Sequence, residues 1–178
     1  MESSSNSNSN YLTGSFRDRT SAERAYNRLR ERGYTDEEIN IIMSDETRRR
    51  YFDKEDEEHE TDFGNKAMEG AGKGSAIGGA VGATAGIIAA LGTSLVIPGL
   101  GVVIAGPIAA GLAGAGAGGL TGGIVGALIG AGIPKDRAEK HEKDIKEGDI
   151  VMGVRPRSDE DASYLEEDWR SYEGNVYK

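Results

Sequence analysis

The chain has 178 residues, a net charge of −9, no cysteine and two histidines. The lack of cysteine excludes disulfides and Cys-ligated metal sites, and two histidines are too few for a multi-histidine metal centre in one chain. An acidic chain without basic stripes argues against nucleic acid as a partner. The composition is uneven, because 22 of the 27 glycines lie between Gly64 and Gly132. A charged part and a glycine-rich part therefore need separate treatment.

The chain begins with a tail rich in serine and asparagine, residues 1–10, which its composition predicts to be disordered. Residues 11–43 follow as a first β-α-β unit. A short β-type run precedes a helix that Thr20 or Ser21 would cap, and Gly33 would end this helix in the left-handed region. A second strand, rich in isoleucine, completes the unit.

Residues 44–66 are nearly all charged or polar, and we expect a solvated connector there. The next segment, 67–133, contains sixty residues, from Gly74 to Ile133, without a single charged side chain. A transmembrane helix needs about twenty apolar residues. The segment is therefore long enough for two crossings and a turn, and we expect a helical hairpin that is embedded in a membrane.

The glycines of this hairpin recur every fourth residue, which places them on one face of each helix. Such flat faces allow two helix backbones to touch. The predicted helices run from about Glu69 to Leu91 and from Pro107 to Ile133. The predicted helix-packing residues are Gly70, Gly74, Gly78, Gly82 and Gly86 in the first helix and Gly114, Gly118, Gly122, Gly126 and Gly130 in the second.

The connector between these helices is the most hydrophobic stretch of the chain, and Pro98 and Gly99 are expected to break the helix there. A loop in water would be more polar. We therefore expect the hairpin tip to lie in the membrane or against another apolar surface. The tip comprises Leu95, Val96, Ile97, Pro98, Gly99 and Leu100.

After the hairpin, residues 134–148 alternate in charge and predict an exposed helix laced with salt bridges, with His141 on the surface. Residues 149–178 form a second β-α-β unit, whose helix Ser158 would cap and whose core Trp169 would join. Each unit alone is too small to be stable. The two units are the parts of a ferredoxin-like domain. The predicted class is therefore α+β, with a split ferredoxin-like domain that carries the glycine hairpin as an insertion.

The chain resembles the bacterial general stress protein family of the YflT-like, heat-induced type. The resemblance rests on four segments: LTGSFRDRTSAERAYNRLRERGYTDEEINIIMS, GAGKGSAIGGAVGATAG, VIPGLGVVIAGPIAAGLAGAGAG and GIPKDRAEKHEKDIKEGDIVMGVR. It implies an association with general stress, and it brings no catalytic residues.

The favoured function is a non-enzymatic membrane-associated stress protein, in which the hairpin anchors and oligomerises a cytoplasmic domain. One alternative is a structural or pore-like oligomer of packed hairpins, and another is a small ligand-binding regulatory domain. A hairpin that dips into one leaflet, or one buried in a soluble assembly, also stays open. We expect no catalytic, metal-binding or cofactor-binding residue and no cofactor.

The expected partners are membrane lipid and other copies of the chain, with no nucleic acid and no identified small-molecule substrate. Lys66 and Lys73 flank one end of the hairpin and Lys135 and Arg137 the other, whereas its tip has no basic residue. The positive-inside rule therefore predicts a membrane-associated protein with both termini in the cytoplasm.

Overall fold

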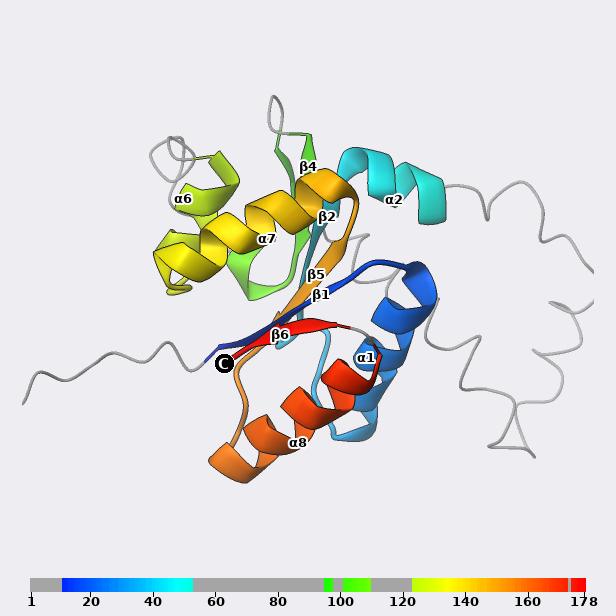
Figure 1. Ribbon diagram of the computed structural model, residues 1–178, viewed down its shortest axis with the longest axis vertical. Helices are drawn as coiled ribbons and strands as arrows, with labels where there is room; N and C mark the ends of the chain where they lie inside the picture. The colour runs from blue at the N-terminus through cyan, green and yellow to red at the C-terminus, as the bar shows by residue number, and fades with distance from the viewer. Residues whose placement is uncertain (1–10, 53–94, 98–100, 110–122, 173) are drawn as a thin grey trace, which may run out of the picture.

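The computed structural model describes residues 11–52, 95–97, 101–109, 123–172 and 174–178. The described chain has the predicted α+β class, with helices on both faces of one antiparallel sheet (Figure 1). The strands lie in the order β3-β4-β2-β5-β1-β6. They are β1 (Leu12–Phe16), β2 (Asn40–Ser44), β3 (Leu95–Ile97), β4 (Val102–Ala105), β5 (Ile150–Val154) and β6 (Asn175–Tyr177).

The helices divide between the two faces of the sheet. In Figure 1, α1 and α8 lie below the sheet, whereas α6 and α7 lie above it. Helix α2 follows β2 directly and lies at one end of that strand. The described helices are α1 (Arg19–Glu31), α2 (Asp45–Tyr51), α6 (Gly123–Gly130), α7 (Lys135–Glu147) and α8 (Asp159–Ser171).

Local signals set most helix ends. Ser158 accepts a hydrogen bond from the backbone N–H of Asp161, as predicted for the start of α8. Gly33 has φ +82°, which confirms the predicted left-handed residue after α1. Helix α1 begins earlier than predicted, because Asp18 is its N-cap instead of Thr20 or Ser21. An aspartate cap satisfies the same unpaired N–H groups and adds a negative charge near the helix N-terminus.

The face of the sheet toward α1 and α8 is apolar from β6 to β4. Side chains alternate between the two faces along a strand, so every second residue of β1, β2, β4 and β5 points to this side. Trp169 is fully buried in this layer, as predicted, with its ring edge-on to Phe16 at a centroid distance of 5.6 Å. The strand residues of this core are Leu12, Phe16, Ile41, Met43, Val103, Ala105, Ile150, Met152, Val154 and Val176.

The opposite face is apolar only at the end near β4. A second core forms there beneath α6 and α7. At the β1 end of the same face the sheet instead presents two buried polar side chains, Thr13 and Ser15. The second core comprises Ile42, Val102, Ile104, Ile108, Ala109, Ile124, Ala127, Leu128, Ile133, Ala138, Ile145 and Val151.

The predicted hairpin tip is partly strand. Leu95–Ile97 forms β3, which pairs antiparallel with β4, and β4 pairs with β2. Pro98, Gly99 and Leu100 lie outside the described residues. The apolar, β-branched character of this stretch is that of sheet strands, and the side chains of β4 are buried on both faces of the sheet.

Three further predictions about the insertion are wrong. A continuous helix from Pro107 to Ile133 does not form, because α6 begins only at Gly123, whose φ of +63° is not helical. The predicted surface position of His141 is also wrong, because the predicted helix with its salt bridges forms as α7 but packs on the sheet with His141 fully buried. Finally, none of the described helices is long and apolar enough to cross a membrane. That finding contradicts the predicted transmembrane helices and the predicted membrane-embedded location as far as the described residues go, whereas the predicted helix from Glu69 to Leu91 lies outside them.

Candidate functional site

The predicted glycine rows fall mostly outside the described residues. The whole first row does so, from Gly70 to Gly86, and so do Gly114, Gly118 and Gly122. Only Gly126 and Gly130 are described, and both belong to α6. Within the described chain, a Cβ added at either position would have no heavy atom within 4 Å. The predicted contact of these glycines with another helix is therefore not made by the described part of this chain.

Helix α6 is apolar on its outer side as well as its inner side. Its inner side chains, Ile124, Ala127 and Leu128, are buried in the second core. Its outer surface carries Ile129, which is 43% exposed, beside Gly130. A surface helix normally presents charged or polar residues on its outer side, and one that is apolar all round is usually covered. The outer face of α6 is therefore one candidate for a contact surface.

A second candidate is a buried polar cluster under α7. His141 comes from α7, whereas Thr13 and Ser15 come from β1. His141 Nε2 lies 2.8 Å from Thr13 Oγ1, and its Nδ1 lies 3.1 Å from Ser15 Oγ. Ser15 Oγ also donates a hydrogen bond to Asp144 Oδ2 at 2.5 Å. The ring of Tyr177 meets that of His141 edge-on at a centroid distance of 5.4 Å.

The hydrogen bonds indicate which ring nitrogen of a neutral His141 carries the proton. Ser15 gives its only proton to Asp144, so its oxygen must accept from the Nδ1–H of His141. Nε2 of a neutral ring then accepts the proton of Thr13. Every polar group of the cluster is satisfied in this arrangement, and His141 has no exposed surface. The hydrogen-bonded cluster of serine, histidine and aspartate therefore holds α7 on β1. It is not arranged as a catalytic site, because a substrate could not reach the buried serine.

The pKa values of two carboxylates at the end of α7 are shifted in opposite directions. Burial opposes ionisation of Asp144, but the nearby His141 side chain and the hydrogen bond from Ser15 outweigh it and lower the pKa of Asp144. Burial raises the pKa of Asp149, and the negative charge of Asp144 raises it further. Folding therefore makes Asp144 easier to ionise and Asp149 harder to ionise than the same groups in an unfolded chain.

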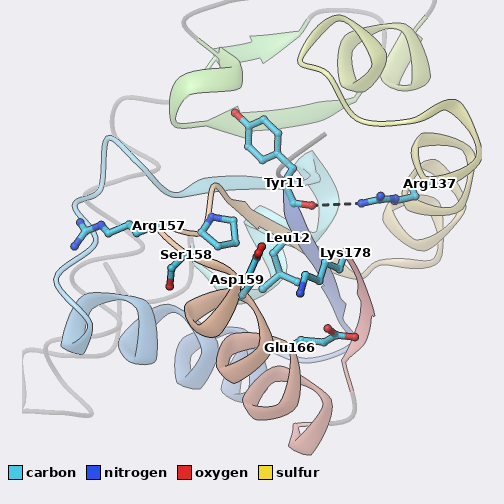
Figure 2. Close-up of a pocket in the computed structure, with 10 residues that line it drawn as sticks. Tyr11, Leu12, Arg137, Arg157, Ser158, Asp159, Glu166 and Lys178 are labelled. Carbon is cyan, nitrogen blue, oxygen red and sulfur yellow. Dashed lines mark hydrogen bonds between the residues drawn. The ribbon is translucent and has the colours of Figure 1, made fainter. Parts of the chain in front are cut away.

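The third candidate is a hollow of about 580 Å³ at the end of the sheet where β1 begins and β5 ends. Its floor includes the buried residues Tyr11 and Leu12. Figure 2 shows Arg137 entering from α7 and Lys178 from the end of β6, while Asp159 comes from the first turn of α8. Arg137 Nη1 donates to the carbonyl oxygen of Tyr11 at 3.3 Å.

The sequence analysis predicted neither the buried polar cluster around His141 nor the hollow. The signal for His141 was present, since Ala138, His141 and Ile145 share one face of a helix at helical spacing. The hollow had no such local signal, because its lining comes from four separate segments of the chain. Within the described residues, no group of three or more His, Cys, Asp or Glu side chains could hold a metal ion.

Comparison with known proteins found no relative of this chain. No protein-family model, curated protein or solved structure matches the chain.

Proposed function

We propose that the protein is a non-enzymatic assembly protein of the general-stress type, in which a ferredoxin-like domain carries a glycine-rich insertion that joins copies of the chain. The strand order supports the ferredoxin-like part of the proposal. Strand β5 lies between β2 and β1, β6 lies beside β1, and a helix joins each β-α-β pair. The stress role rests on the resemblance of the sequence segments to that family.

The observation that supports assembly is the outer face of α6. Ile129 is exposed there beside Gly130, and Gly126 leaves a flat surface one turn away. Covering the exposed part of Ile129, which is 43% exposed, contributes on the order of 1 kcal/mol, and glycines let a second backbone approach closely. A second copy of the same helix supplies a matching flat, apolar face, as isologous contacts in symmetric dimers require.

The absence of cysteine from the chain permits a direct test. We would replace Ile129 with cysteine in the full chain and oxidise it under mild conditions. A disulfide-linked dimer is expected, because paired α6 helices bring the two thiols together. The matched control is Ser163→Cys, whose position on α8 is also exposed but belongs to the other face of the sheet. It should form far less dimer.

The mass of the unmodified protein completes the test. Light scattering should give a mass above that of one 18.8 kDa chain, and Gly126→Leu should lower it by blocking the close approach. A monomeric mass, together with an Ile129→Cys variant whose thiol resists both oxidation and maleimide labelling, would mean that the chain covers its own α6. That result would contradict assembly through this face.

A further inference from the structure

The cations around the hollow differ from the other cations of α7. On the outer side of this helix, Lys135, Lys143 and Lys146 each pair with a glutamate one turn away. Arg137 has no carboxylate partner within the described residues, and its recorded hydrogen bond goes to the carbonyl oxygen of Tyr11. In a chain of net charge −9, acidic partners are abundant. Arg137 is therefore available for an anionic ligand.

Lys178 adds a second cation to the same hollow. Its ammonium group donates to Ser163 Oγ at 3.4 Å, and it too has no carboxylate partner in the described part of the chain. Two further cations stack on aromatic rings instead of pairing with acids, and one of these rings, that of Tyr11, lines the hollow. Arg155 lies over the ring of Tyr11 at 4.7 Å, and Lys140 lies over the ring of Tyr177 at 4.9 Å. The third cation that lines the hollow, Arg157, pairs with Glu38 at 3.2 Å, so Arg137 and Lys178 are the lining cations that have no carboxylate partner among the described residues.

The two acidic residues of the hollow lie on its opposite wall, which α8 forms. Glu166 is neutralised by Arg170 at 2.6 Å. Asp159, in the first turn of α8, has no recorded ion-pair partner among the described residues. The hollow thus offers donors from Arg137 and Lys178 and one free acceptor group from Asp159. Its volume of about 580 Å³ lies within the range of small-molecule sites, about 300–1,000 Å³.

We propose that this hollow binds a small organic oxyanion, a phosphate or a carboxylate, that carries an amine or hydroxyl at its other end. The oxyanion lies between Arg137 and Lys178, and the amine or hydroxyl faces Asp159. Arginine has several N–H donors in a planar fork, so the bond to the carbonyl oxygen of Tyr11 leaves others for an oxyanion. This site is independent of the contact face of α6.

Binding would be measured by calorimetry with the full chain and three probes: inorganic phosphate, phosphoserine and citrate. We expect saturable binding of phosphoserine or citrate that weakens as salt is added. Inorganic phosphate should bind more weakly than phosphoserine, because it cannot reach Asp159. Preference for phosphoserine would identify a phosphate ligand, and preference for citrate a carboxylate ligand.

Variants would assign the binding to these residues. Arg137→Gln and Lys178→Gln should each weaken binding of the preferred probe about tenfold, and Asp159→Asn should weaken phosphoserine more than inorganic phosphate. Arg24→Gln removes one positive charge from α1, outside the hollow, and should change binding less than twofold. Far-UV circular dichroism and a thermal melt of each variant would check that its fold is intact.

Three results would overturn the proposal. The first is that none of the probes binds saturably at millimolar concentration. The second is that a folded Arg137→Gln/Lys178→Gln double variant binds as tightly as the unmodified protein. The third is that Arg24→Gln weakens binding as much as Arg137→Gln, since this would indicate attraction by general charge.

Discussion

The two faces of the sheet are built on different principles. The face toward α1 and α8 is held mainly by apolar burial, with Trp169 against Phe16 at its centre and Tyr34 bonded to Asp161 of α8 at its margin. The face toward α6 and α7 is apolar near β4 but polar near β1, where His141 binds Thr13 and Ser15. Helix α7 covers both parts of that second face. The difference shows how a strongly charged helix can still dock on a sheet, namely by satisfying buried polar groups along part of its length.

The largest expected effect lies on the apolar face. Trp169→Ala removes the largest fully buried side chain and leaves a cavity beside Phe16 and Gly14. We expect the free energy of unfolding to fall by about 3–5 kcal/mol, measured by urea denaturation followed by far-UV circular dichroism. Tyr164→Ala is the control on the same helix, because Tyr164 is 41% exposed. An equal loss in the control would mean that burial does not govern this face.

A substitution in the polar half of the other face should lower the free energy of unfolding by less. His141→Leu keeps the volume of the buried side chain but leaves the hydroxyl of Thr13 without its partner. An unsatisfied buried group costs about 1–3 kcal/mol, and denaturation should show a loss of that size. Adding Thr13→Val removes the orphaned hydroxyl and should restore part of the stability. If the double variant were no more stable than His141→Leu, hydrogen bonding would not be what holds α7 here.

Local chemistry is why much of the first face could be predicted from the sequence. Ser158 and Gly33 act within one turn of the chain, and the alternation of apolar and polar residues in β1 is visible in any short window. The second face depends on segments that are distant in sequence. The sequences of β3 and β4 are short apolar runs. Such runs have no periodicity that distinguishes a strand from a buried helix, so they are equally compatible with the apolar turn predicted here. Only their pairing with β2 identifies them as strands.

The misplacement of His141 follows from the same cause. The charges of α7 indicate an exposed helix, and that is true of its outer side, where Lys143 and Glu147 pair. Its inner side becomes buried because the sheet presents a second face to it. Nothing within residues 134–148 shows that Thr13 and Ser15 will lie beneath this helix. Arg137 and Lys178 likewise meet only after both β-α-β units have joined one sheet.

The next effect in size is a dependence on pH. The pKa of Asp144 is held below its ordinary value of 3.8 in the folded protein. Its contribution to stability is therefore present above the unfolded pKa and is lost as the pH falls through the folded one. Asp144→Asn should cost about 1 kcal/mol at pH 7, since the amide oxygen can still accept from Ser15. The difference between the two proteins should shrink in acid.

Asp149 provides a control of opposite sign. Burial and the charge of Asp144 raise its pKa above 3.8, so its contribution to stability is present in acid and is lost as the pH rises through the folded pKa. Asp149→Asn should therefore raise the free energy of unfolding at pH 7. Denaturation curves at several pH values between 3 and 7 would test both variants. Parallel curves for the two would contradict the opposite pKa shifts.

The smallest effect is expected on the outer side of α7, which separates surface charge from buried polarity on one helix. Lys143 and Glu147 pair at 3.6 Å, with 75% and 59% of their side chains exposed. An exposed pair of this kind contributes about 0–1 kcal/mol, so Lys143→Gln should change the free energy of unfolding by less than about 0.5 kcal/mol. The same measurement as for His141→Leu would place both on one scale. A loss at Lys143 as large as that at His141 would mean that the outer side of α7 is also covered, and the contrast between its two sides would fail.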